Sequence, residues 1–187
     1  MADPGDLAVL ASRISADLSA AGITHALSGS LSLAAYARPR ATLDADFLVV
    51  AAAVRWPQVF AIVRSHGFEG DDRECIRSVR ERGHALLLSG PVAIDILVPQ
   101  IPYHEQVARR AVRIRLEGHD VPLVTAEDLF VLKALWWRPK DALDLDVLAE
   151  ATRGKLDAEY VRTTLRSLLP DDDPRHARVG AMLRSAT

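Results

Sequence analysis

The sequence is poor in cysteine and has no long apolar run. Its one cysteine, Cys75, rules out an intramolecular disulfide and a cysteine-rich zinc site. No apolar stretch reaches the length needed to cross a bilayer, and the first residues lack the basic and then apolar pattern of a signal peptide. We therefore expect a cytoplasmic protein that does not contact a membrane.

Three common catalytic motifs are also missing. The chain has no Gly-x-x-x-x-Gly-Lys-Ser/Thr loop of a P-loop kinase, no Gly-x-Gly-x-x-Gly dinucleotide turn and no Gly-x-Ser-x-Gly nucleophile elbow. Its six histidines show no metal-ligand spacing, and we interpret His25, His84 and His104 as structural. These absences disfavour several hydrolase, kinase and dehydrogenase classes.

Length and charge limit the organisation of the chain. Its 187 residues suffice for one substantial core, so we predict one compact unit with a core over 1–124 and a helical C-terminal part over 125–187. The formal net charge of -2 argues against a general nucleic-acid coat but leaves room for a local basic groove.

Apolar periodicity and turn residues give the expected elements. The expected strands cover residues 23–27, 44–50, 85–88, 92–98, 112–116 and 121–124. The expected helices cover residues 6–21, 31–37 and 56–66, a stretch from 125 to a break at Pro139, a second stretch from about Asp141, and a short last segment after 174.

Two carboxylates lie on one predicted strand. In the strand over 44–50, a side-chain period of two puts Asp44 and Asp46 on the same face, roughly 6.6 Å apart. Because like charges side by side are costly without a counter-ion, and because Mg²⁺ takes hard oxygen ligands, this pair predicts a metal site. The alternative is that both acids pair with Arg38 and Arg40.

A third carboxylate stands alone in another apolar strand. Asp95 is the only charge in the strand over 92–98, and an ionised group in a central strand is rarely structural. Beside the first strand it would complete a three-carboxylate site, either as a metal ligand or as the base that takes a proton from a hydroxyl.

A small-residue turn precedes the first acids. Gly29 allows close approach, and the helix expected after it directs backbone amides at an anion, which suits Ser30 as a phosphate ligand or a helix cap. Ser28 is compatible with the same site or with an ordinary turn. Arg40 and Thr42 are positioned either to touch phosphate or to brace the acid strand, and the sequence does not choose between these roles.

At this point the chain resembles the polymerase-β-type nucleotidyltransferase superfamily. The shared pattern is the Gly29-Ser30 turn, the acid-x-acid pair Asp44-Ala-Asp46 and the later acid Asp95. The segment from Thr125 to Leu145, with Lys133 followed by Arg138-Pro-Lys140-Asp141-Ala-Leu-Asp144, is similar to the AbiEii/MenT-like toxin group of toxin-antitoxin systems. The resemblance implies an α/β (α+β) fold, a nucleotidyltransferase-type mixed β-sheet flanked by helices.

Lysine usage gives an independent indication. The chain has only three lysines among 23 basic residues, and Lys133 interrupts an apolar run, so we assign its ammonium to a triphosphate rather than to a snorkelling surface position. The resemblance adds Arg138, Lys140, Asp141 and Asp144 to the nucleotide site. The alternatives are that Asp141 caps the next helix and that Asp144 pairs with Lys140.

The sequence thus predicts an enzyme that moves a nucleoside monophosphate from a nucleoside triphosphate to a hydroxyl and releases pyrophosphate. Asp44 and Asp46 hold Mg²⁺, or Mn²⁺ in its place, Gly29 and Ser30 cradle phosphates, and Asp95 binds metal or acts as the base. The resemblance implies an RNA acceptor such as the tRNA 3′ end, and a cognate antitoxin. The alternatives are an aminoglycoside- or lincosamide-type nucleotidyltransferase and a non-catalytic binding module. Basic stretches available to RNA contain Arg73, Arg77, Arg80 and Arg82, and Arg109, Arg110, Arg113 and Arg115.

Overall fold

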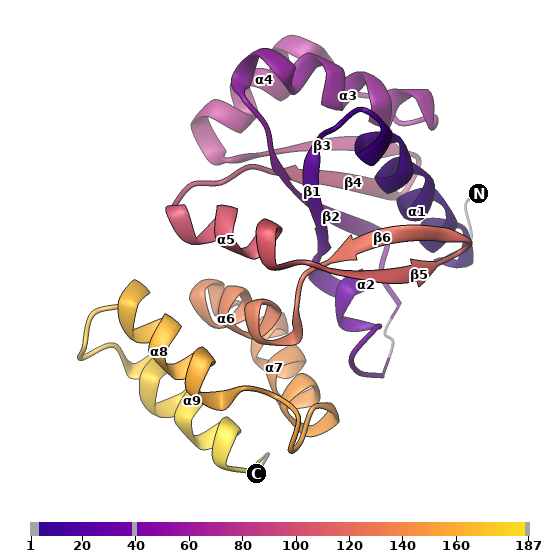
Figure 1. Ribbon diagram of the computed structural model, residues 1–187. Coiled ribbons are helices and arrows are strands. Elements are labelled where there is room, and N and C mark those ends of the chain that lie inside the picture. Colours follow the sequence, from indigo (N-terminus) through magenta and orange to yellow (C-terminus); the bar gives the residue numbers. More distant parts are fainter. Residues whose placement is uncertain (1–3, 39–40, 186–187) are drawn as a thin grey trace. The chain divides into compact units, whose positions relative to one another are not determined.

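A mixed six-stranded sheet carries the site residues of the first half of the chain. The structure is a computed structural model that describes residues 4–38 and 41–185 (Figure 1). The strands are β1 (Thr24–Ser28), β2 (Asp44–Val50), β3 (His84–Ser89), β4 (Val92–Leu97), β5 (Val112–Leu116) and β6 (His119–Leu123). Their order in the sheet is β3-β4-β2-β1-β6-β5.

Helices connect and follow these strands. They are α1 (Pro4–Ala20), α2 (Gly29–Leu33), the 3-10 turn η1 (Ala53–Arg55), α3 (Trp56–Ser65), α4 (Asp72–Arg82), α5 (Pro102–Arg110), α6 (Ala126–Trp136), α7 (Pro139–Ala151), α8 (Ala158–Leu168) and α9 (Pro174–Ser185). The predicted α+β class, a mixed sheet with flanking helices, is confirmed. No helix in the described ranges combines the length and the apolar character that a bilayer span requires.

The pairing of β2 is central to the site. It runs antiparallel to β1 and parallel to β4, and β4 forms an antiparallel hairpin with β3. Period-two alternation directs Phe47 and Val49 into the core, where α1, α3 and α4 cover one side of the sheet. On the other side, α5 lies against β1 and β2 (Figure 1). The opposite face of β2 therefore carries Asp44 and Asp46.

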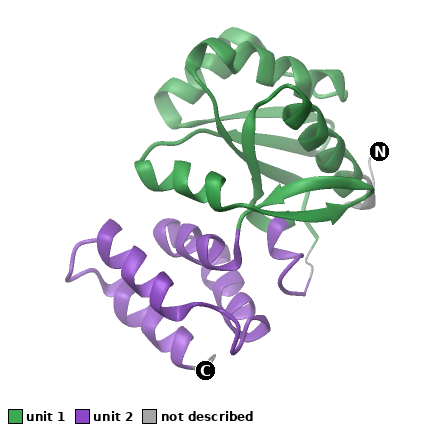
Figure 2. Cartoon of the chain, viewed as in Figure 1, with its two compact units in different colours: residues 1–31, 40–124 green, residues 32–39, 125–187 purple. Residues whose placement is uncertain are grey.

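The chain divides into two compact units (Figure 2). Unit 1 consists of residues 1–31 and 40–124, and unit 2 consists of 32–39 and 125–187. The last of the three borders falls after residue 124. Residues 32–39 group with the helical part instead of with the segment that surrounds them in sequence.

Several helices differ from the sequence-based expectation. The helix after the small-residue turn begins at Gly29 and ends at Leu33, earlier than the predicted 31–37. Pro139 is the first residue of α7, a position that its missing N–H and fixed φ favour, so it starts a helix. The break comes two residues earlier, at Trp137, whose φ of 49° is left-handed.

Two helices of unit 1, α4 and α5, were not predicted. The eleven residues of α4 are mostly charged, and this hid its helical pattern. Its ends are well marked: the Asp71 carboxylate accepts hydrogen bonds from the backbone N–H groups of Arg73 and Glu74, and Gly83 closes the helix with a φ of 77°.

Candidate active site

The three candidate metal-binding acids share one face of the sheet. Asp46 on β2 lies directly opposite Asp95 on β4, and Ser28 at the end of β1 lies opposite Asp46 on its other side. Asp44 occupies the same face of β2 two residues earlier. Adjacent strands are about 4.8 Å apart, so the sequence-distant Asp95 becomes a direct neighbour of Asp46. We call Asp44, Asp46 and Asp95 the sheet acids.

The sheet acids are partly enclosed. All three are half-buried, while Ala45 and Phe47 on the other face of β2 are fully buried. The side chain of Asp95 keeps 16% of its surface exposed. These carboxylates can therefore be reached by a ligand while much of their hydration is already removed.

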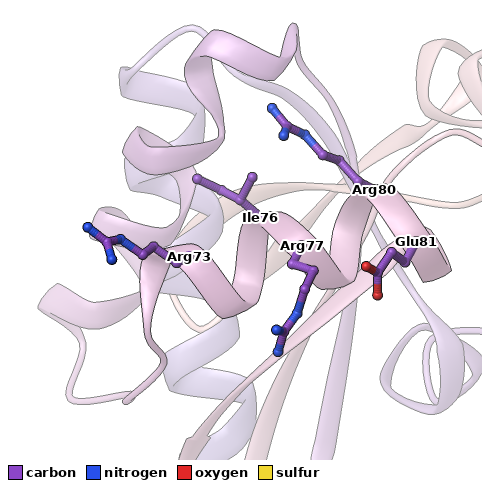
Figure 3. A pocket seen from close by; sticks show the side chains of 5 residues that line it. All are labelled: Arg73, Ile76, Arg77, Arg80 and Glu81. Carbon is purple, nitrogen blue, oxygen red and sulfur yellow. The ribbon is translucent and has the colours of Figure 1, made fainter.

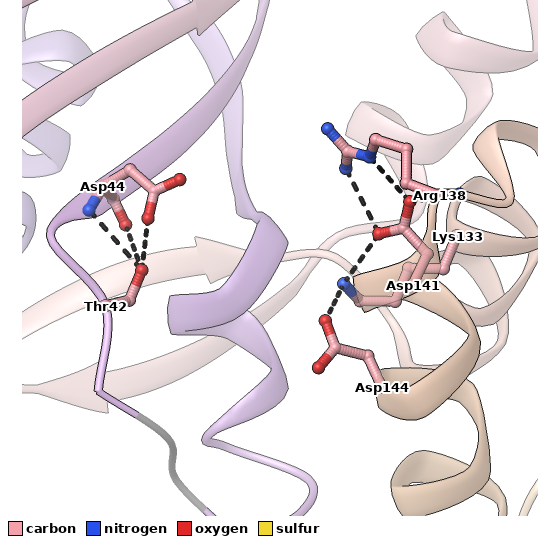
Figure 4. Close-up of polar contacts among 6 residues, drawn as sticks. All are labelled: Thr42, Asp44, Lys133, Arg138, Asp141 and Asp144. Carbon is pink, nitrogen blue, oxygen red and sulfur yellow. Dashed lines mark hydrogen bonds and ion pairs between the residues drawn. The ribbon is translucent and has the colours of Figure 1, made fainter.

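Thr42 and His84 contact two of the sheet acids, Asp44 and Asp95. The Thr42 hydroxyl donates a hydrogen bond to the Asp44 carboxylate, which favours the strand-bracing role of Thr42 (Figure 4). Arg40 lies outside the described residues. On β3, Nδ1 of His84 lies 3.0 Å from Oδ1 of Asp95.

The contact of His84 with a sheet acid was not expected from the sequence. His84 was interpreted as structural, and its neighbour became evident only from the β3–β4 register. His25 does fit the structural interpretation. Its Nδ1 donates to the Ile23 carbonyl and its Nε2 accepts from the Ser15 hydroxyl, and burial lowers its pKa, which favours the neutral ring.

The small-residue turn packs directly onto a sheet acid. Gly29 has a φ of 65°, and a Cβ atom built on it would lie 1.7 Å from Oδ2 of Asp46. A side chain at this position would displace the Asp46 carboxylate. The flanking Ser28 and Ser30 are 2% and 7% exposed. The turn, both serines and Asp46 thus form one close-packed group at the end of β1.

The sheet acids have the chemistry of a magnesium site but do not form a closed one. Across the described residues, no group of three or more His, Cys, Asp or Glu side chains converges closely enough to hold a metal ion. Two carboxylates on one strand and a third on the next strand nevertheless supply the hard oxygen donors that Mg²⁺ prefers, and Mg²⁺ commonly takes its other ligands from water and substrate phosphates. The donor set fits that ion.

Unit 2 contains a second group of acids, which is paired. Nζ of Lys133 on α6 lies 2.7 Å from Oδ2 of Asp144 and 3.6 Å from Oδ1 of Asp141, and Nε of Arg138 lies 2.7 Å from Oδ2 of Asp141 (Figure 4). Lys133 is 3% exposed, Asp141 0% and Asp144 4%. We call these four residues the ion cluster. Its formal charges cancel.

Asp141 shows how the ion cluster is held together. Burial acts to raise the pKa of Asp141, but hydrogen bonds from the Arg138 side chain and backbone, and the charge of Lys133, outweigh it and lower the pKa. The Arg138 backbone N–H donates to Asp141 over 3.1 Å, so Asp141 does cap α7. Lys133 is not a snorkelling lysine, and Asp144 pairs with it instead of with the exposed Lys140.

Arginines line a hollow on α4. Arg73, Arg77 and Arg80 follow one another at helical spacing along a hollow of about 390 Å³, together with Ile76 and Glu81 (Figure 3). Within the described part of the chain, no carboxylate forms an ion pair with these three guanidinium groups. We call the three residues the α4 arginines. In the other basic stretch, Arg109 pairs with Glu105 and Arg115 pairs with Asp120.

Comparisons with known proteins identify the fold. No protein-family model and no curated protein sequence matches the chain. Among solved structures, the antibiotic-resistance factor ANT(2'')-Ia in solution is similar over 96% of both chains, with a TM-score of 0.60 and 14% identity. The same protein in complex with adenylyl-2''-tobramycin aligns over 97% of both chains, with a TM-score of 0.51 and 13% identity.

A fungal protein shares the fold as well. An antigenic nucleotidyltransferase-like protein from Paracoccidioides brasiliensis aligns over 95% of this chain and 92% of its own, with a TM-score of 0.54 and 14% identity. The chain therefore has the fold of nucleotidyltransferases, as the superfamily resemblance implied. The closer grouping with AbiEii/MenT-like toxins stays a prediction.

Proposed function

We propose that the protein transfers a nucleoside monophosphate from a nucleoside triphosphate to a hydroxyl. The register that aligns Ser28, Asp46 and Asp95 across three neighbouring strands carries this proposal. Gly29 supports it, because its missing side chain leaves room for a carboxylate against the turn. The Mg²⁺ dependence rests on the donor chemistry of the sheet acids, and Mn²⁺ meets the same requirement.

Each residue has a defined part in the proposed reaction. Asp44 and Asp46 would hold the metal ion, which would neutralise phosphate charge and orient the triphosphate. Gly29 and Ser30 receive the β- and γ-phosphates. The acceptor oxygen bonds to the α-phosphorus as the bond from that phosphorus to the bridging oxygen breaks. The hydroxyl proton passes to the Asp95 carboxylate, and pyrophosphate leaves.

The orientation of Asp95 depends on His84. A carboxylate that takes a proton must point one oxygen at the hydroxyl, and the contact between Nδ1 of His84 and Oδ1 limits its rotation. His84 is thus a positioning residue for the proposed base. Lys133 remains our candidate for contacting the triphosphate, although its ammonium is already held by Asp141 and Asp144.

The charges of unit 1 favour a polyanionic acceptor, and we propose an RNA end such as the tRNA 3′ end. Three guanidinium groups without ion-pair partners among the described residues line the hollow on α4, and such groups bind phosphates. An aminoglycoside, the class of antibiotic whose adenylyl-2''-tobramycin derivative is bound by the structural neighbour, carries several amino groups and would need an acidic lining. The toxin role and a cognate antitoxin rest only on the resemblance of the segment around Lys133.

The second candidate is a small-molecule nucleotidyltransferase. It is favoured by the near-complete coverage of ANT(2'')-Ia, whose length this chain matches. Competition separates the candidates: the protein is incubated with each α-labelled nucleoside triphosphate and Mg²⁺, together with total RNA, tobramycin or lincomycin. We expect label in RNA and none in either antibiotic.

A matched pair of variants tests the residues. Asp95→Asn should abolish transfer, while Asp120→Asn, which removes an exposed carboxylate on β6, should leave it unchanged. Transfer to an antibiotic alone would replace RNA as the acceptor. Absence of nucleotide binding and of pyrophosphate release with every acceptor would indicate a non-catalytic binding module.

A further inference from the structure

Two leucines on β3 occupy positions that face away from the core. Leu86 and Leu88 are 49% and 50% exposed, whereas Ala85 and Leu87 between them are buried on the other face. The outward positions of an edge strand are usually polar or charged, because exposed apolar residues promote aggregation. Packing of the hydrophobic core therefore does not explain why these two positions are leucines.

The register places both leucines beside the sheet acids. Leu86 lies directly opposite Asp95, which lies opposite Asp46, and Leu88 lies opposite Ala93, which lies opposite Asp44. Each leucine thus lies on the acid-bearing face, one strand (about 4.8 Å) beyond its partner residue on β4. A molecule that brings its hydroxyl to Asp95 from the β3 side must lie over these leucines.

The backbone edge of β3 is already hydrogen-bonded at Leu88. Leu88 donates its N–H to the Glu69 carbonyl over 2.9 Å and accepts from the Glu69 N–H over 2.7 Å. Another strand therefore cannot pair with β3 there, and the leucines are reached only from the face of the sheet. A stable protein interface buries about 800 Å² on each partner, and two half-exposed leucines do not approach that area.

We propose that Leu86 and Leu88, the leucine platform, bind the base of the acceptor nucleotide whose ribose hydroxyl is modified. This inference rests on the proposed function. Side chains two residues apart on a strand are roughly 6.6 Å apart, which suits the flat apolar face of a nucleobase. Every base has such a face, so the platform tolerates different terminal nucleotides.

A paired change in protein and acceptor tests the platform. The acceptor KM is measured with an RNA oligonucleotide and with the same oligonucleotide ending in an abasic ribose that keeps its hydroxyls. For the wild type, we expect removal of the base to raise the KM about ten-fold, the effect of losing the burial of a small apolar surface against the leucines. For Leu86→Thr/Leu88→Thr, we expect a KM that is already raised about ten-fold and that changes little when the base is removed. The KM for the nucleoside triphosphate should not change.

Two controls exclude a general effect on folding. Leu86→Met keeps an apolar side chain and should retain the wild-type KM. Val54→Thr removes another exposed apolar group, 85% exposed and at the far end of β2 from the acids, and should have no effect. Threonine suits strands, so β3 should form in the double variant. The comparison of the two oligonucleotides on the wild type holds even if that variant does not fold.

The outcomes separate this inference from the proposed function. Transfer to RNA with the same KM for both oligonucleotides, or with an unaltered KM in the double variant, overturns the platform and leaves the proposed function intact. Absence of transfer to any RNA overturns the platform and the RNA acceptor, and absence of transfer to every acceptor overturns the proposed function itself.

Discussion

The sheet acids and the ion cluster use the same carboxylates in opposite electrostatic settings. In unit 2, Asp141 and Asp144 are buried against Lys133 and Arg138, so the cluster is neutral by itself. In unit 1, Asp46 and Asp95 face each other across two strands, and the contact described for Asp95 is with an imidazole. Paired carboxylates stabilise a fold. Carboxylates aligned next to one another instead favour a cation that arrives with a substrate.

Removal of Lys133 should have the largest effect on stability. Lys133→Ala removes the ammonium that Asp144 and Asp141 contact in a buried setting, so we expect the free energy of unfolding to fall by about 3–5 kcal/mol. Chemical denaturation measures this change. Lys140→Ala, at an exposed position of the same helix pair, should change it by less than about 0.5 kcal/mol. Unchanged stability with lost nucleotide turnover would instead support the triphosphate role of Lys133.

The sheet acids should give the opposite result. Asp46→Asn removes a proposed metal ligand and one of two adjacent negative charges. We expect nucleotide transfer to fall by more than about 100-fold, because loss of a metal ligand costs more than loss of a residue that only hydrogen-bonds to a ligand. We expect the free energy of unfolding to stay level or rise. Transfer assays at saturating Mg²⁺ and denaturation of the same sample test this. Near-normal turnover would remove Asp46 from the metal site.

Gly29 offers a smaller and more local change. Gly29→Ala and Gly22→Ala both force alanine into a φ of 65°, which costs about 1–2 kcal/mol. Nothing lies within 4 Å of a Cβ at Gly22, whereas at Gly29 the atom would meet the Asp46 carboxylate. We therefore expect similar backbone strain in both variants, and loss of transfer only in Gly29→Ala. Equal activity would show that the turn does not position Asp46.

The smallest expected effect concerns acid stability of the ion cluster. The folded-state pKa of Asp141 is lowered, so its contribution is present above the unfolded pKa of about 4 and is lost as pH falls toward the folded value. Arg138→Ala should therefore flatten the decline in unfolding free energy below about pH 4. Denaturation at a series of pH values measures the slope. An unaltered slope would show that Lys133 alone sets the charge of Asp141.

Local patterns predicted the strands well and the contacts between distant residues poorly. The strand beginning at Asp44 and ending at Val50 was predicted with the correct bounds, since a short β-branched apolar run is a strong signal. The alignment of Asp46 with Asp95 depends on strand order, which no local pattern encodes. The pairing of Lys133 with Asp144 likewise depends on the packing of α6 against α7.

Segment 32–39 has a consequence for synthesis of the chain. It groups with residues 125–187, so it is synthesised about ninety residues before the helices with which it forms unit 2. In this segment, burial together with Glu127 and Asp128 raises the pKa of Tyr36 to about 12. A nascent chain that stops at residue 124 would leave Tyr36 without these two neighbours. The two units are thus interdependent in the order of their folding, although most of each is continuous in sequence.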